Sequence, residues 1–200
     1  MQWAIDLVGP LPLTPAKKDM MIVATDYFTK WIEAEALSST KEANVERFIW
    51  RNIIQFGYPQ SLVTDSGSQF IDKQITAFFS KYKIKQHLST SWYTQGNGQA
   101  EASNKVILDC LKKRLEGAEG KWVDELPGVL WAYRTTKQRS TGETPFSLPY
   151  GMEAIIPPHI TVPSISLELK SYYNKRAKIR QFQPVDVMLR NAFITTPRQG

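Results

Sequence analysis

The sequence has very little cysteine and histidine. Its 200 residues include one cysteine, Cys110, and two histidines, His87 and His159. A single cysteine excludes an internal disulfide and fits a reducing compartment, and these three residues are too few for a His/Cys zinc site of the finger type. Cys110 falls on the apolar stripe of an expected helix, so we expect it in the core and not as a nucleophile.

Several sequence patterns are also missing. No apolar run approaches the roughly 18 residues of a membrane span. The N-terminus has no basic region and reaches an acid at Asp6, so we expect no signal peptide. The glycine-lysine loop of P-loop nucleotide hydrolases and the Gly-x-Ser-x-Gly elbow of serine hydrolases are absent, which leaves both chemistries without support.

The charge is unevenly distributed. The net charge is +6, and residues 168–200 carry seven basic residues against two acidic ones. A nearly neutral body with a basic C-terminal extension suits a polyanionic partner such as nucleic acid. The same composition is also typical of a solvated tail, so charge alone leaves both interpretations open.

The hydrophobic pattern predicts a mixed α/β fold. Short apolar runs indicate strands, and apolar residues at a 3.6-residue period indicate helices. Ser39 or Thr40 is expected to cap the first helix. The first three strands, joined by short links, predict an antiparallel meander, and the later strands alternate with helices. The expected strands are 3–8, 20–25, 31–37, 62–64 and 84–88, and the expected helices are 40–55, 71–82, 98–115, 119–126 and 127–137.

Three acids have an unusual setting. Asp6 lies within the first strand, Asp65 ends the fourth, and Glu101 is in the first turn of the long helix, with 35 residues between Asp65 and Glu101. If strands 1 and 4 are neighbours, their acids lie side by side, and a helix crossing the strand ends can supply the third. Three ionised carboxylates need cations between them, and Mg²⁺ prefers such oxygen ligands. Two such ions can support phosphoryl transfer.

Each acid also has a structural alternative. Asp6 could pair with a buried arginine. Asp65 could serve as a turn or helix-cap residue, a common use of aspartate before a helix. Glu101 could form an ordinary ion pair with Lys105, one helical turn further on. The case for catalysis therefore rests on the three acids together.

Six blocks of the sequence carry a resemblance to a known family. The chain resembles the catalytic core of retroviral and LTR-retrotransposon integrases, most of all the Ty3/gypsy type, in family order through residues 3–163. The blocks are residues 3–12 (WAIDLVGPLP), 25–31 (TDYFTKW), 63–70 (VTDSGSQF), 96–101 (GNGQAE) with Asn104 and Lys105, 131–135 (WAYRT), and 140–146 (STGETPF) with Tyr150 and Gly151.

The resemblance implies an RNase H-like fold with a five-stranded mixed sheet and flanking helices. It also implies that Asp6, Asp65 and Glu101 form the family's D,D-35-E triad and hold two Mg²⁺ (or Mn²⁺) ions. The implied reactions are trimming of the element's cDNA ends by water and attack of the new 3′-hydroxyl on target DNA, both in-line phosphoryl transfers.

The same resemblance implies a set of DNA contacts around the glutamate. Lys105 and Lys112 lie on the Glu101 face of the helix and are suited to phosphate contact. An ordinary solvated lysine face is an equal alternative for both. The residues expected to contact DNA are Asn97, Gln99, Asn104, Lys105 and Lys112. DNA partners, a homo-oligomer, a nuclear location and no membrane association are the matching expectations.

The sequence departs from the family pattern in three places. Ser66 stands where asparagine usually follows the second aspartate, the family's upstream zinc domain is missing, and the small C-terminal barrel has a start without closure. We therefore expect a catalytic core at 1–163 and a basic, truncated extension at 164–200. The alternatives are a catalytically impaired or domesticated relic that only binds nucleic acid, and an RNase H-type nuclease without strand transfer.

Overall fold

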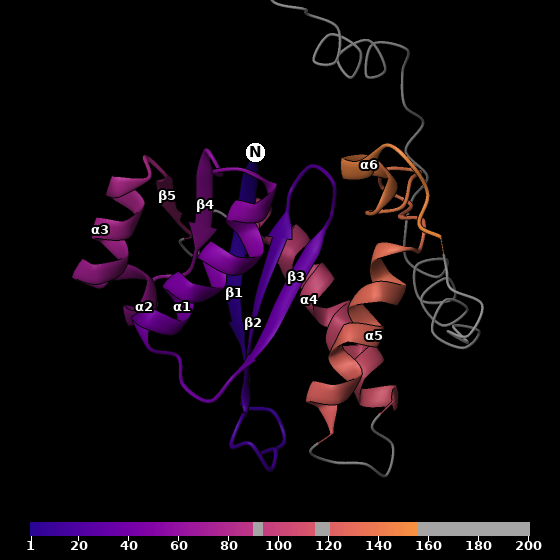
Figure 1. The fold of residues 1–200 in the computed structure, drawn as a ribbon, viewed down its shortest axis with the longest axis horizontal. Helices are drawn as coiled ribbons and strands as arrows, with labels where there is room; N and C mark the ends of the chain where they lie inside the picture. The colour runs from indigo at the N-terminus through magenta and orange to yellow at the C-terminus, as the bar shows by residue number, and fades with distance from the viewer. Residues whose placement is uncertain (90–93, 115–120, 156–200) are drawn as a thin grey trace, which may run out of the picture.

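A five-stranded mixed sheet forms the centre of the molecule (Figure 1). The computed structural model describes residues 1–89, 94–114 and 121–155. For residues 94–101 and 114 it describes the backbone alone. All five expected strands are confirmed. They are β1 (Gln2–Val8), β2 (Met20–Asp26), β3 (Ile32–Leu37), β4 (Ser61–Thr64) and β5 (Lys85–Leu88).

The strand order is β3-β2-β1-β4-β5. The strands β1, β2 and β3 form the expected antiparallel meander, while β4 runs parallel to β1 and β5 parallel to β4. The central strand β1 is buried at Trp3, Ala4 and Ile5. Strands 1 and 4 are therefore direct neighbours, as the pairing of the first two acids requires.

Helices cover both faces of the sheet (Figure 1). One layer contains α1 to α3 and the other contains α4 and α5, with α4 packed on β1, β2 and α5. The helices are α1 (Glu42–Phe48), α2 (Ser68–Ile71), α3 (Lys73–Lys81), α4 (Thr94–Arg114), α5 (Trp122–Arg134) and α6 (Ser147–Tyr150).

Each face of the sheet has its own apolar core. Trp3 and Ile5 pack with α1 and α3 residues such as Phe48, whereas Met21 and Val23 pack with α4 and α5. Because side chains alternate along a strand, Ala4 and Asp6 belong to the face under α4. The strand thus buries one face with large apolar groups and leaves Asp6 on the other.

The expected helix at 40–55 is divided in the structure. After α1 the chain forms a π-helical turn, η1 (Ile49–Ile53), and a 3₁₀ turn, η2 (Ile54–Phe56). The predicted cap is wrong, because the N-cap is Lys41, which makes no side-chain cap bond. The Ser39 hydroxyl instead accepts from the Lys41 backbone N–H at 3.3 Å, before the helix begins.

Two other helix predictions need correction. The expected helix at 71–82 is split at Asp72, whose extended backbone ends α2 and whose carboxylate caps α3 by accepting from Gln74 N at 2.8 Å. Conversely, the two helices expected on either side of Pro127 are one helix, α5. Its buried stripe includes Trp122, Leu126 and Val129 and continues past the proline, so packing on the sheet outweighs the missing hydrogen bond.

Of the helices in the described part of the chain, none is long and apolar enough to cross a membrane. Cys110 is buried in the α4 core, as expected. The predicted start of a C-terminal barrel and the predicted domain boundary at 163/164 lie outside the described residues.

Candidate active site

Asp6 and Asp65 lie at the same level on neighbouring parallel strands. The register of β1 and β4 ends with the pair Ala4 and Val63, and each aspartate stands two residues further along its strand direction. Because strand side chains alternate with a period of two, Asp6 is on the sheet face of Ala4, which α4 covers. Asp65 follows the last residue of β4, so the strand register places its backbone at the level of Asp6 on the neighbouring strand.

The carboxylate of Asp6 is oriented by two donors. Its Oδ1 accepts from the Leu7 backbone N–H at 2.9 Å, and its Oδ2 accepts from the Asn104 side-chain amide on α4, also at 2.9 Å. Asp6 is only partly buried. Neutral N–H donors leave the carboxylate its negative charge, so these hydrogen bonds are compatible with a metal ligand.

Asp65 is exposed and follows directly after β4. Its Oδ1 accepts from the Gly67 backbone N–H at 2.9 Å, which closes a turn of the type aspartate favours. The N-cap of α2 is Gly67, so Asp65 is a turn residue and not a helix cap. One carboxylate oxygen is used for this turn, and metal binding through the carboxylate remains compatible with it.

The glycine after Asp65 is required for space. The backbone angles of Gly67 are φ −62° and ψ 143°, which any residue can adopt, so the turn does not depend on glycine's conformational freedom. A Cβ at this position would lie 2.9 Å from Asp65 Oδ1 and would also overlap the Gln69 side chain. Glycine therefore allows the Asp65 carboxylate to fold back over the turn.

The third acid, Glu101, lies on α4 in the turn before Asn104. Residues three apart occupy the same helix face, so the face that carries Glu101 is the face whose Asn104 amide contacts Asp6. The Glu101 side chain is outside the described part of the structure, and no metal-binding group of three or more His, Cys, Asp or Glu forms among the described residues. The helix backbone places position 101 on the same side of α4 as Asn104.

The residues predicted to contact DNA divide into three groups. Lys105 and Lys112 are exposed on α4, so their positions are open to a phosphate backbone. Asn104 is only 5% exposed, and its amide is bonded to Asp6. Asn97 and Gln99 lie on α4, but their side chains are outside the described set. Contact with DNA stays a prediction for all five.

One atom of this site is unsatisfied within the described structure. Asn104 Oδ1 is buried and has no hydrogen-bond partner there. A buried acceptor left without a partner costs about 1–3 kcal/mol, so such an atom calls for an explanation beyond packing. The sequence indicated Asn104 as a DNA contact, and its bond to Asp6 is a relation that the sequence did not reveal.

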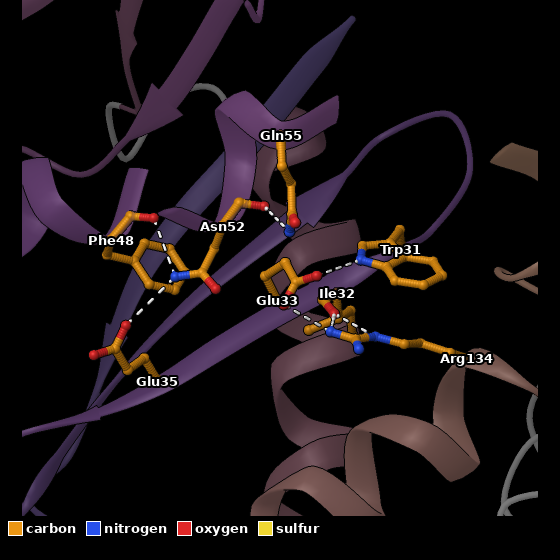
Figure 2. Close-up of polar contacts among 8 residues, drawn as sticks. All are labelled: Trp31, Ile32, Glu33, Glu35, Phe48, Asn52, Gln55 and Arg134. Atoms are coloured by element: carbon orange, nitrogen blue, oxygen red, sulfur yellow. Dashed lines mark hydrogen bonds and ion pairs between the residues drawn. The ribbon is translucent and has the colours of Figure 1, made fainter. Parts of the chain in front are cut away.

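A second acidic cluster lies at the β3 edge of the sheet. Figure 2 shows Arg134 reaching from α5 to Glu33, with Arg134 Nη2 2.8 Å from Glu33 Oε2. The same guanidinium donates to the Ile32 carbonyl through Nε at 3.0 Å and Nη2 at 2.6 Å. Its Cζ lies 4.4 Å from the centroid of the Trp31 ring, and Trp31 Nε1 donates to Glu33 Oε1 at 2.8 Å.

The contacts of this cluster attach α5 to the edge of the sheet. Burial lowers the pKa of the Arg134 guanidinium from its ordinary value, and the adjacent Glu33 charge opposes that shift. Both Glu33 oxygens and the guanidinium have partners, which is what a buried ion pair requires. On the same strand, Glu35 Oε2 accepts from Asn52 at 3.4 Å (Figure 2). The sequence blocks contained Trp31 and Arg134 but did not indicate this contact.

The sheet topology and the positions of the two aspartates define a class of protein. A mixed five-stranded sheet with aspartates at the carboxyl ends of neighbouring strands, crossed by a helix that carries a glutamate, is the RNase H-like fold.

Comparison with known proteins identifies the family within that class. Residues 1–93 match the model of the integrase core domain family. The bovine (Bos taurus) "Gypsy retrotransposon integrase-like protein 1" is 27% identical over 142 residues, 71% of this chain and 28% of the relative. The Gag-Pol polyprotein of feline leukemia virus is 30% identical over 151 residues, 74% of this chain and 9% of the polyprotein.

A solved structure agrees with the observed fold. The catalytic core domain of HTLV-2 integrase, described in complex with magnesium and in a trimeric form, matches with a TM-score of 0.60 at 19% identity, covering 74% of this chain and 94% of that one. Residues 1–93 thus match an integrase core domain, the family that the sequence blocks predicted. It spans less than a third of the length of either curated relative described above.

Proposed function

We propose that this chain is a metal-dependent polynucleotidyl transferase core that joins the 3′ ends of retroelement cDNA to target DNA. The observation that carries the proposal is the hydrogen bond from Asn104 to Asp6. It fixes the Glu101-bearing face of α4 against a strand whose acid lies level with Asp65. This arrangement supports a shared site for the three acids of the predicted triad.

The donor set fits hard divalent cations. Asp6 and Asp65 supply carboxylate oxygens, and Glu101 is the third ligand that the resemblance implies; Mg²⁺ and Mn²⁺ prefer such oxygen ligands. Two ions bound there would activate the attacking oxygen and neutralise charge on the leaving oxygen during in-line displacement. The two hydrogen bonds on Asp6 would hold its carboxylate in one orientation for that task.

The helix surface beside the acids supports a nucleic-acid substrate. Lys105 and Lys112 are exposed on α4, and exposed lysines are suited to phosphate contacts that position a strand without reading its sequence. We place the protein in the nucleus because its proposed target is DNA. We also propose that it acts as a homo-oligomer, since the two ends of one cDNA must be joined to the same target DNA; the HTLV-2 neighbour is itself described as trimeric.

The test uses the full 200-residue chain with Mg²⁺ or Mn²⁺. The substrates are a duplex carrying the element's LTR end and a branched intermediate that reports the reverse, disintegration reaction. We expect product from the wild type and none from Asp65→Asn. The matched control is Asp72→Asn, because Asp72 is an equally exposed aspartate that caps α3 and asparagine is an equally good cap.

Two outcomes would contradict the proposal. Equal product from wild type and Asp65→Asn would exclude the role given to Asp65. Salt-sensitive retention of DNA on a filter, without product in either metal, would instead favour a module that only binds nucleic acid.

A further inference from the structure

Asn104 is a buried polar side chain of α4 that donates a hydrogen bond to an acid of the candidate site. Its side chain is 5% exposed, its Nδ2 donates to Asp6 Oδ2 at 2.9 Å, and its Oδ1 is buried without a partner in the described residues. Neither polar end of the amide is presented to solvent. A direct contact with DNA would therefore require this side chain to leave its place.

We propose that Asn104 is a positioning residue that orients the Asp6 carboxylate for metal binding. This inference rests on the proposed function, because it assumes that Asp6 is a metal ligand. The Leu7 backbone N–H fixes one oxygen of Asp6, and the Asn104 amide fixes the other. The carboxylate plane is thus set by one donor from its own strand and one from the helix that carries Glu101.

The chemistry of the bond supports positioning over simple helix attachment. An amide N–H donates a hydrogen bond without adding a positive charge, so the bond from Asn104 leaves the Asp6 carboxylate its negative charge for a cation. A helix could be attached to β1 by apolar contacts alone, as Val106 and Ile107 already show by being fully buried on this face. Donors that orient a metal-binding carboxylate are typical of metal sites, where their loss costs about 10-fold to 100-fold in metal affinity or activity.

The test compares Asn104→Leu with Ser103→Ala in the full-length chain. Leucine has nearly the shape of asparagine and removes both the donor and the unpaired Oδ1, so we expect little loss of folding stability. Ser103 is the neighbouring buried polar residue on α4, and its Oγ lies 3.4 Å from the Tyr133 hydroxyl, away from the acids. The probes are Mg²⁺ and Mn²⁺ alone, titrated by calorimetry, with stability followed by thermal unfolding.

We expect Asn104→Leu to weaken Mg²⁺ binding by about 10-fold to 100-fold. Mg²⁺ demands near-ideal octahedral geometry, so a misplaced ligand should reduce Mg²⁺ binding and Mg²⁺-supported product more than their Mn²⁺ counterparts. Ser103→Ala should bind both ions as the wild type does. Should Asn104→Leu unfold, Asn104→Ala removes the same donor without adding an apolar group and is measured in the same way.

The outcomes separate this inference from the proposed function. If Asp65→Asn loses Mg²⁺ binding while Asn104→Leu binds Mg²⁺ like the wild type, the positioning role is excluded and the metal site stands. The positioning role is also excluded if Asn104→Leu loses Mg²⁺- and Mn²⁺-supported product equally. If the wild type binds neither ion, the metal site and the positioning role are both overturned.

Discussion

The two acidic regions of the sheet differ in how their carboxylates are satisfied. At the β3 edge, Glu33 is 9% exposed and both of its oxygens have side-chain donors, one of them the cation of Arg134. At the candidate site, Asp65 is exposed, and the hydrogen bond it accepts comes from the backbone of Gly67. Glu33 is thus enclosed by side chains of its own chain, whereas the exposed Asp65 carboxylate is accessible to a ligand.

This difference separates a structural acid from a candidate catalytic one. A buried carboxylate without a cation is very costly, so Glu33 requires Arg134 for the fold itself. The two aspartates stand at the same level of two parallel strands, and two like charges at such a distance are stabilised by a cation between them. The comparison predicts that substitutions at the β3 edge reduce stability, whereas substitutions at the candidate site reduce the reaction.

The largest effect is expected from Asp6→Asn set against Glu33→Gln. Asp6→Asn keeps the size of the side chain but removes a ligand charge and confronts the Asn104 amide with a second amide. We expect metal-dependent product to fall by more than about 100-fold, the upper end for outer-shell partners of metals. Glu33→Gln should lower the thermal unfolding temperature and retain product per folded molecule.

The readouts for this pair are product formation in Mg²⁺ and thermal unfolding of the same preparations. The assay temperature is chosen where circular dichroism shows each variant folded. Comparable loss of product in both variants under these conditions would mean that the β3 edge also contributes to the reaction, and the distinction between the two regions would fail.

The next effect is the destabilisation expected from Arg134→Met. This variant leaves Glu33 buried without its cation and removes both donors from the Ile32 carbonyl. Breaking a buried pair by removing one partner typically costs about 3–5 kcal/mol. Lys137→Met is the control, because Lys137 is an exposed cation shortly after the end of the same helix.

Urea unfolding measures both variants, and Lys137→Met should remain within about 0.5 kcal/mol of the wild type. A double substitution with Glu33→Gln then gives the coupling energy of the pair. A cost below about 1 kcal/mol for Arg134→Met would show that the pair behaves like a surface salt bridge and does not join α5 to the sheet.

The strands and the positions of the acids could be predicted from the sequence. The apolar run of β1 and the short apolar run of β4 predicted two strands of the sheet. The acids that interrupt or end these runs indicated a functional site because buried charge is rare. The neighbouring placement of β1 and β4 then followed from the fold that the resemblance implied. These features depend on local pattern and on a small set of allowed topologies.

The contacts that distinguish the two regions could not be predicted in the same way. The bond from Asn104 to Asp6 joins residues 98 apart, and the bonds from Arg134 to the Ile32 carbonyl join residues 102 apart. No local pattern encodes such pairs. The same limit applies to α5, where Pro127 indicated a boundary and the buried stripe on the sheet kept the helix continuous.

The smallest effects are expected from two glycines, Gly67→Ala and Gly142→Ala. At Gly67 the backbone is ordinary, but a Cβ would lie 2.9 Å from Asp65 Oδ1, so the carboxylate must move. We expect about a tenfold loss of Mg²⁺-supported product, the lower end for displaced metal ligands, with stability nearly unchanged. At Gly142 φ is +71° and nothing lies within 4 Å of a Cβ, so alanine should cost about 1–2 kcal/mol of stability and leave product per folded molecule unchanged.

These two variants each add one methyl group, Gly67→Ala beside the candidate site and Gly142→Ala at a position with a structural role alone. One methyl group presses on the Asp65 carboxylate, and the other only strains the backbone of a surface turn. Product formation in Mg²⁺ and urea unfolding of both variants provide the measurements. If Gly67→Ala keeps full Mg²⁺-supported product while Gly142→Ala shows its stability cost, the position of the Asp65 carboxylate does not limit the reaction. The role of Asp65 would then be to close the turn with Gly67. The catalytic assignment would depend on Asp6 and the Glu101 face of α4.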